Sequence, residues 1–353
     1  MKFFSNMSFK GSVNQARRCA LGCITKHIGG LDNPIDVNNI NVHKILISRP
    51  NNRLGNQILM TPIIQEVSNL FPNCTIDLFV RGGLALIIFK NYKNIDRIIC
   101  LPRKPFKNLM QYLMVWVKLR NKKYDLIINV DNGSSSGKLS TKLSRSPIKI
   151  FNNPDERLLH IYNDYVHIAK NPVYNLRRCF DKNIGVNKDR PIPVLDLKLD
   201  SNEKNRGKEL LQELVSNNKK TICIYTFATG GKCYSHLWWT KLYDRLKGEY
   251  GEYYNIIEIL PIENISQINF AAPSFYSRNI REMAALIANS TLFIGADSGI
   301  MHLACSSGTP TIGLFSVTNV KCYEPYGNKN MAIHTNGQEV ETIIDAINKV
   351  LIK

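Results

Sequence analysis

Long apolar runs are absent from this chain of 353 residues, and none reaches the ~18 residues that a membrane-spanning helix needs. The stretch 1–30 mixes charge, asparagine and glycine without an apolar centre, so we expect no secretory signal. The nine cysteines are scattered, and although Cys19 and Cys23 fall one helical turn apart, no second pair completes a zinc set. We therefore expect reduced thiols in a cytoplasm, with no metal site and no cofactor.

Acidic residues are scarce in the first half of the chain. Residues 1–200 contain 31 Lys and Arg against 14 Asp and Glu, whereas residues 201–353 contain 15 against 14. A one-sided positive field implies an anionic partner for the N-terminal half. Zinc-finger spacings, RNA-binding aromatic motifs and heptads are all missing, so we expect no nucleic acid. A phosphorylated glycolipid acceptor at the inner face of the cytoplasmic membrane fits better, with the protein bound peripherally.

Basic residues surround one apolar segment, 109–117, which we expect to be a helix with one face in the core. These cations can rest on anionic lipid headgroups, each contributing about 1 kcal/mol near such a surface. The basic cluster comprises Arg103, Lys104, Lys107, Lys118, Arg120, Lys122 and Lys123.

Strand and helix patterns alternate along the chain, which predicts α/β architecture with parallel sheets. The predicted strands are 44–48, 75–80, 97–101, 126–130, 148–151, 221–227, 256–260, 291–294 and 311–315. The predicted helices are 57–70, 108–119, 156–169, 203–215, 280–289 and 338–351.

The length predicts two domains. We expect an irregular basic segment over 1–40, a first domain over 41–190 and a second over 201–353, joined by a linker over 191–200 that contains Pro191 and Pro193.

The strand that ends near Ile294 passes through a short polar turn into a helix with small residues. Such a junction directs free N–H groups and the positive end of the helix dipole into one crevice, which suits a diphosphate. Asp297 can cap the helix, Ser298 offers a hydroxyl, Gly299 allows close approach of a ligand, and His302 lies on the face of Ser298. The alternative is an ordinary helix start with a core histidine.

Three strings in the chain resemble the bacterial heptosyltransferase family, known as glycosyltransferase family 9. They are the pattern DSGxMHLAxxxGxP from Asp297, the stretch from Ile45 to Pro62, and Lys232 followed by Trp238 or Trp239. The resemblance runs from about Lys44 to the C-terminus. It implies a GT-B fold of two Rossmann-like domains that face each other across a cleft, and an inverting transferase that uses a nucleotide sugar.

The resemblance also implies that the C-terminal half holds the donor, ADP-heptose, and the N-terminal half the lipopolysaccharide-core acceptor. The leaving diphosphate would be received by the helix start and by the Lys232 ammonium without a metal, and Lys232 thus counts as catalytic as well as donor-binding. The alternative for Lys232 is a solvated loop lysine. The full set of expected donor residues is Thr226, Thr229, Lys232, Glu263, Asp297, Ser298, Gly299 and His302.

The first glycine loop departs from the family pattern. The residue after Gly55 is usually an aspartate that is taken as the catalytic base, and here it is Asn56. A neutral amide cannot serve as a base. The base can have moved to Asp131, which follows a strand, although Asp-Asn-Gly is equally a turn signal. Alternatively Asn56 only orients the acceptor hydroxyl, or the chain is a weakly active or silent paralogue.

The acceptor side is expected around the same loop. Arg49 and Arg53 flank the loop and can hold a phosphate or carboxylate, or can be surface arginines. The expected acceptor residues are Arg49, Arg53, Gly55, Asn56 and Gln57.

The predicted function is transfer of a heptose from ADP-heptose to the anionic lipopolysaccharide core by direct displacement. The alternatives are transfer of another sugar to an O-antigen or protein acceptor, and a silent relative that binds a nucleotide or a glycan.

Overall fold

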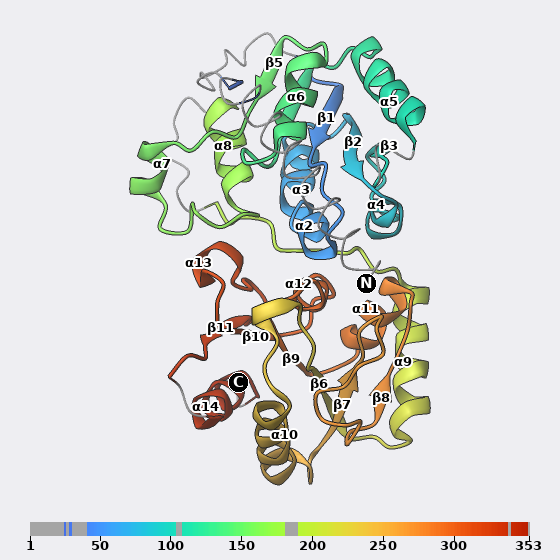
Figure 1. Cartoon of the computed structure of the whole chain (residues 1–353), viewed down its shortest axis with the longest axis vertical. Coiled ribbons are helices and arrows are strands. Elements are labelled where there is room, and N and C mark those ends of the chain that lie inside the picture. The colour runs from blue at the N-terminus through green and yellow to red at the C-terminus, as the bar shows by residue number, and fades with distance from the viewer. Residues whose placement is uncertain are drawn as a thin grey trace, which may run out of the picture.

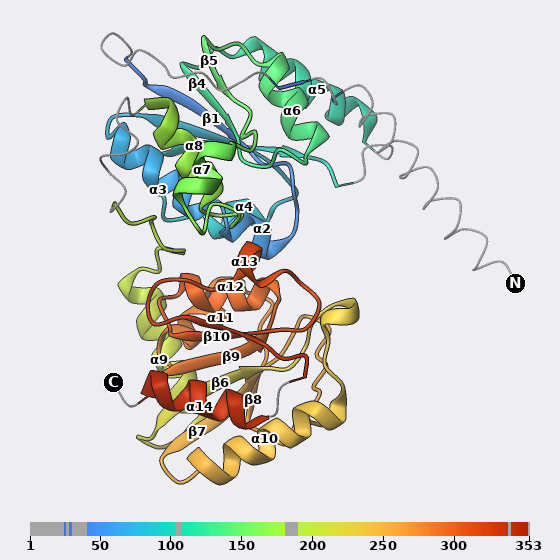
Figure 2. The ribbon, with the colours of Figure 1, turned by 90° about the vertical axis from the view of Figure 1, so that its left-hand side faces the viewer.

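The computed structural model describes residues 25, 28–29, 41–103, 108–180, 190–337 and 340–351. The predicted segment 1–40 lies outside the described residues apart from three positions, and so do Lys104 and Lys107 of the basic cluster. In the described chain, two sheets with helices on their faces form two α/β domains (Figures 1 and 2). The α/β architecture predicted from the sequence is confirmed.

The first sheet has the order β3-β2-β1-β4-β5, and its strands pair in parallel. Its strands are β1 (Lys44–Ser48), β2 (Thr75–Arg81), β3 (Ile95–Leu101), β4 (Leu126–Asn129) and β5 (Ile148–Ile150). The helices of this half are α2 (Leu54–Ile58), α3 (Thr61–Leu70), α4 (Leu84–Ile88), α5 (Leu109–Asn121), α6 (Ser135–Leu143), α7 (Glu156–Ile161) and α8 (Asn171–Phe180).

The second sheet has the order β11-β10-β9-β6-β7-β8, again parallel. Its strands are β6 (Lys220–Tyr225), β7 (Tyr254–Ile259), β8 (Ser274–Phe275), β9 (Leu292–Ala296), β10 (Thr311–Phe315) and β11 (Met331–His334). The helices are α9 (Ser201–Val215), α10 (His236–Tyr250), α11 (Ile280–Ala288), α12 (Gly299–Ser306), α13 (Val320–Tyr323) and α14 (Val340–Leu351), with a 3₁₀ turn at Gly230–Lys232.

The central strands β1 and β6 have continuous apolar runs, as expected for strands that helices cover on both faces of the sheet. Ile45 to Ile47 in β1 and Ile222 to Ile224 in β6 are fully buried. The C-terminal helix α14 follows the predicted periodicity, and its apolar side chains, from Val340 to Val350, pack on β6, β9 and β10.

The predicted helix 57–70 is wrong in its first turns. The chain forms the short helix α2 from Leu54, breaks at Leu59 and Met60, and starts α3 at Thr61. Pro62 lies in the first turn of α3, where its missing N–H costs nothing, but it would interrupt a continuous helix. Gly55 and Asn56 therefore lie in a helical turn and not in the predicted loop.

The predicted helix 156–169 is also wrong, since α7 ends at Ile161 and the next helix, α8, was missed. Tyr162 takes an extended conformation, and its ring stacks on that of Tyr174 at 4.1 Å between centroids. Asp164 then accepts hydrogen bonds from Tyr174 and Lys170. Contacts with α8 thus end the helix at Ile161. The local sequence pattern could not predict them, because they join residues of different elements. The strands β8 and β11 were also missed, because their 2 and 4 residues are too few to show a clear periodicity.

Arg281 at the start of α11 ties the two domains and their connection together. Its side chain is 5% exposed, and its Nε and Nη2 donate to the Glu203 carboxylate at 2.5 and 2.7 Å. Its other donor groups reach backbone carbonyls of α4 in the first domain and of the connecting segment, namely those of Ile87, Ile88, Leu197 and Lys198. One guanidinium therefore links the two domains and their connection.

Replacing Arg281 with Met keeps the volume but removes these donors. We expect the free energy of unfolding to fall by about 3 kcal/mol, since a half-buried carboxylate and several carbonyls lose their partner. Hydrogen bonds from Arg281 lower the pKa of Glu203 to about 2 from 4.5. Their contribution is thus complete above pH 4.5 and lost as the pH falls toward 2. Urea unfolding at several pH values should show Arg281→Met flattening this dependence. Arg245→Met, which removes an exposed pair with Glu249, is the control and should behave as the parent.

Candidate active site

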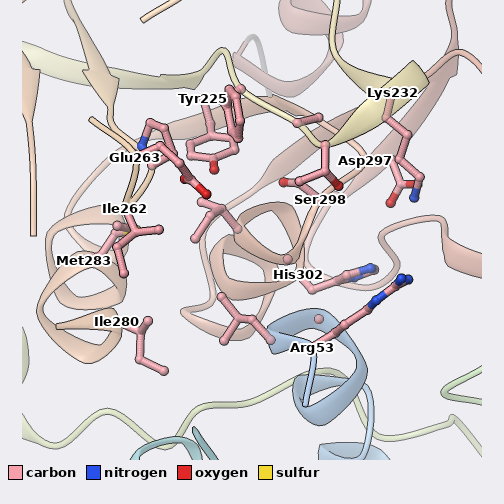
Figure 3. A pocket seen from close by; sticks show the side chains of 18 of the residues that line it. Arg53, Tyr225, Lys232, Ile262, Glu263, Ile280, Met283, Asp297, Ser298 and His302 are labelled. Atoms are coloured by element: carbon pink, nitrogen blue, oxygen red, sulfur yellow. The ribbon is translucent and has the colours of Figure 1, made fainter. Parts of the chain in front are cut away.

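A pocket of about 600 Å³ lies between the two domains, at the carboxyl ends of the strands. The first domain contributes residues 53–56, and the second contributes the segments after β6, β7 and β9 together with the starts of α11 and α12. Figure 3 shows this pocket, with Arg53 pointing into it from the residue just before α2. We call it the larger pocket, and its volume suits a ligand of drug or nucleotide size.

One side of the larger pocket is charged. Lys232 donates to Asp297, and the N-terminus of α12 opens beside them. Ser298, not Asp297, caps α12, because its Oγ accepts the Met301 N–H at 3.3 Å while the Asp297 carboxylate holds Lys232. The predicted role of Asp297 as helix cap is thus wrong. Lys232 is 37% exposed and Asp297 5%, so the ammonium faces the pocket and the carboxylate lies beneath it.

His302 is buried on the same charged side, and its Nδ1 has no hydrogen-bond partner in the described chain. Burial lowers its pKa to about 4, as do the Lys232 and Arg49 cations, while Asp297 opposes the shift. The imidazole is therefore neutral at neutral pH, with one N–H to donate and one nitrogen to accept. It can bind a hydroxyl or a phosphate oxygen by a hydrogen bond but adds no charge.

The opposite side of the larger pocket is mainly apolar. Ile262, Ile280 and Met283 lie together there in Figure 3, with Glu263 and Tyr225 above them. An apolar wall with a few polar groups at its rim accommodates a flat heterocycle and orients it by hydrogen bonds. We call the charged side, which suits an anion, the anion-binding side, and the apolar side, which suits a flat ring, the ring-binding side.

Two glycines bring the domains into contact at the edge of this pocket. A Cβ on Gly55 would lie 2.8 Å from the His302 ring and 3.3 Å from Gly299 Cα. A Cβ on Gly299 would lie 3.1 Å from Leu54 Cβ and 3.2 Å from Gly55 N. The short helix α2 thus rests on the start of α12 with no room for a side chain between them, and this contact places Arg53 and Asn56 over the anion-binding side.

A smaller pocket of about 300 Å³ adjoins this contact on the side of the first domain. Arg49 and Asp131 line it, and Asn56 and Tyr323 line both pockets. Arg49 is only 2% exposed. Its Nη2 donates to Asn56 Oδ1 at 3.3 Å, whereas Nε and Nη1 are buried without a partner in the described chain. Burial lowers the pKa of Arg49, and Asp131 nearby opposes the shift.

The structure brings most of the predicted residues together but separates them into two groups. The larger pocket is lined by Arg53, Gly55, Asn56, Thr229, Lys232, Glu263, Asp297, Ser298, Gly299 and His302, and the smaller by Arg49, Asn56 and Asp131.

Thr226 and Gln57 line neither pocket. Thr226 is buried and donates to Glu258 Oε1 at 2.5 Å, while Gln57 Nε2 donates to the carbonyls of Asn51 and Arg81. Both side chains hold loops in place. The sequence prediction also missed Tyr323, and no motif marks this residue, since it comes from α13 after β10.

Comparisons with known proteins show which family this chain resembles. Residues 277–345 match the model of glycosyltransferase family 9 (heptosyltransferase). The lipopolysaccharide heptosyltransferase 1 of Campylobacter coli is 27% identical over 297 residues, which cover 75% of this chain and 82% of that protein. A family 9 glycosyl transferase from Veillonella parvula DSM 2008 superposes with a TM-score of 0.68 at 17% identity, over 89% of this chain and 98% of its own. The E. coli heptosyltransferase WaaC with ADP gives a TM-score of 0.64 at 16% identity, over 87% and 99%.

These matches confirm the resemblance to the heptosyltransferases predicted from the sequence, and the solved structures confirm the GT-B fold. The family match runs from just before α11 into α14 and so includes the whole α12 junction.

The glycine contact gives a direct test of how the domains are held together. Gly299→Ala should separate α2 from α12, because the added methyl meets Leu54 Cβ and the Gly55 backbone. We expect amide hydrogen exchange in both helices to become at least about tenfold faster, as measured by mass spectrometry. Gly248→Ala in α10 is the matched control, since no atom of the described part of the chain lies within 4 Å of its Cβ position. Unchanged exchange in Gly299→Ala would mean that this contact does not hold the domains together.

Proposed function

We propose that this chain, a glycosyltransferase similar to the heptosyltransferases of family 9, moves a heptose from ADP-heptose to an anionic acceptor of the lipopolysaccharide core, with inversion at the anomeric carbon. The observation that carries the proposal is the convergence of Lys232, Arg53 and the α12 N-terminus on one side of an interdomain pocket. The reaction takes place in the cytoplasm at the inner face of the membrane that holds the acceptor.

The anion-binding side receives the diphosphate. The N–H groups at the start of α12 and the positive end of its dipole favour a phosphate there. Lys232 approaches from the 3₁₀ turn after β6 and now pairs with Asp297. A diphosphate would take the ammonium as a second partner, and the leaving nucleotide would be stabilised by these groups rather than by a divalent cation. Asp297 and His302 are then placed to hold sugar hydroxyls or phosphate oxygens.

The ring-binding side receives the nucleoside. The apolar wall formed by Ile262, Ile280 and Met283 fits a base, and Glu263 at the rim can accept a hydrogen bond from it. The relative WaaC was solved with ADP, and its fold matches this chain. The donor we assign is therefore ADP-heptose.

The smaller pocket receives the acid group of the acceptor. Arg49 is a buried cation, and two of its nitrogens have no partner among the described residues, which is costly unless an anion completes its hydrogen bonds. Arg53 adds a second cation at the adjoining edge of the larger pocket. An acceptor that carries phosphate or carboxylate groups would therefore bind across the first domain.

The transfer step takes place at the junction of the two pockets, where Asn56 and Tyr323 line both. The acceptor oxygen attacks the anomeric carbon and forms a bond to it. The bond between the anomeric carbon and the phosphate oxygen breaks, and the nucleoside diphosphate leaves with the electron pair. Asn56 cannot take the acceptor proton, and its amide oxygen already accepts from Arg49. We assign the base to Asp131, which faces the smaller pocket and whose Oδ1 accepts the Gly133 N–H at 2.9 Å. Asn56 then orients the acceptor hydroxyl through its Nδ2.

The donor assignment predicts a preference among nucleotides. Calorimetric titration should show tighter binding of ADP than of GDP or UDP, and ADP-heptose should support turnover with a lipopolysaccharide-core acceptor. Lys232→Ala should weaken ADP at least about tenfold, the size of a lost charged hydrogen bond, and leave acceptor binding unchanged. Lys247→Ala on the exposed side of α10 is the control for the loss of one charge.

Other results would select another function. A preference for GDP or UDP sugars would favour a different donor, with an O-antigen or protein acceptor. Binding of ADP-heptose without turnover would favour a silent paralogue, the alternative that Asn56 supports.

The base assignment predicts the effect of Asp131→Asn. We expect kcat to fall by about 10²–10⁴, the range for loss of a general base, while the KM for the donor stays near the parent value. Glu263→Gln is the paired variant, because Glu263 is a second carboxylate that lines the larger pocket. Undiminished kcat in Asp131→Asn would remove Asp131 from this role, and a collapse of kcat in Glu263→Gln alone would transfer the role to Glu263.

A further inference from the structure

Helix α5 exposes apolar side chains on the face that points away from the protein. Its inner face packs Tyr112, Val115, Trp116 and Leu119 against the first sheet. Its outer face should by the usual pattern be polar. Instead, five outer side chains are between 50% and 74% exposed, and all are apolar: Leu109, Met110, Leu113, Met114 and Val117.

These side chains form one continuous patch. Residues 109, 113 and 117 follow each other at helical spacing, and residues 110 and 114 form the neighbouring row. Scattered exposed apolar residues are ordinary, but a contiguous patch on one helix face marks a binding surface. We call this set the α5 patch.

Cations border the α5 patch at both ends. Arg103 precedes the helix, and Lys118, Arg120 and Lys123 lie at its end, all of them exposed. Neighbouring α6, which lies beside α5 in Figure 2, adds Lys138 and Lys142 and contains no acid.

The stretch 101–150 contains two acidic residues, Asp125 and Asp131, and neither neutralises the cations around the α5 patch. The Asp125 carboxylate accepts the backbone N–H groups of His43 and Lys44 at 2.9 and 2.8 Å. Asp131 faces the smaller pocket. The patch is thus apolar at its centre and positive at its margin.

We propose that the α5 patch inserts into the headgroup region of an anionic lipid bilayer, with the bordering cations on lipid phosphates. Apolar side chains ringed by Lys and Arg fit such an interface, where both forces act together. A second copy of the chain fits less well, because a symmetric contact would bring the same cations face to face. Nucleic acid would leave the apolar centre without a partner.

The inference rests on the proposed function, because a lipopolysaccharide-core acceptor would bring the enzyme to a membrane. The α5 patch belongs to the first domain, which contains the smaller pocket, and α5 lies on the outer side of that domain, away from the second domain (Figure 1). Docking through α5 would hold the acceptor half at the bilayer and leave the donor half accessible to a water-borne nucleotide sugar.

The test is flotation of the full-length protein with vesicles that contain neither donor nor acceptor. We expect the parent chain to bind vesicles of phosphatidylcholine and phosphatidylglycerol, and the double variant Met110→Ser, Met114→Ser to bind at least about tenfold more weakly. Leu237→Ser is the matched control, because Leu237 is 82% exposed but lies on α10 of the other domain. The pair Lys118→Gln, Arg120→Gln should weaken binding to these vesicles and leave binding to pure phosphatidylcholine unchanged.

Two results would overturn the inference. One is equal flotation of the parent and the Met110, Met114 variant. The other is a parent chain that self-associates through the patch in sedimentation velocity and does not float. Urea unfolding shows whether the variants remain folded. The flotation test uses no substrate, so its result does not depend on catalysis. A failed transfer assay would therefore contradict the proposed function but not the membrane contact. Conversely, transfer to a detergent-dispersed acceptor should stay within about twofold in the double variant, because its substitutions lie outside both pockets.

Discussion

The close approach of Gly55 and Gly299 is the constraint on which the site depends. Each glycine belongs to a different domain, and each lacks the side chain that would hold the other away. Their contact brings the start of α12, with its free N–H groups, against the short helix that carries Arg53 and Asn56. The two pockets meet there, because α2 belongs to the wall of both. Closure of the domains is therefore not separate from the chemistry, since it assembles the place where donor and acceptor would meet.

Buried charge supports the same arrangement at two further points. Arg281 donates to a carboxylate of its own domain, to carbonyls of the connection and to two carbonyls of the first domain, and the last two hydrogen bonds are made only when the domains stand together. Arg49 is equally buried, but two of its nitrogens have no partner in the described chain. The first arginine is a structural tie, and the second is available to an anion. The difference between them lies in their hydrogen-bond partners and not in the residue type.

The positive charge of the first half serves two different surfaces. Arg49 and Arg53 face the pockets, whereas Lys118, Arg120 and Lys123 lie around the apolar outer face of α5. The charge count in the sequence gives only the total positive charge of these two surfaces. Only the fold assigns each cation to one surface, because α5 and the loop after β1 lie on different sides of the first domain.

The sequence alone determined the parallel strands other than the short β8 and β11, most of the longer helices and the α12 junction, because these depend on periodicity, burial and residues close together in the chain. It also identified Lys232, Asp297, Ser298 and His302 as neighbours of that junction. Only the tertiary structure decided that Ser298 and not Asp297 caps α12 and that Tyr323 lines both pockets. It also decided that the side chains of Thr226 and Gln57 form hydrogen bonds outside the pockets. Each of these depends on which partner a side chain meets across the fold, and the spacing of residues along one strand or helix does not contain that information.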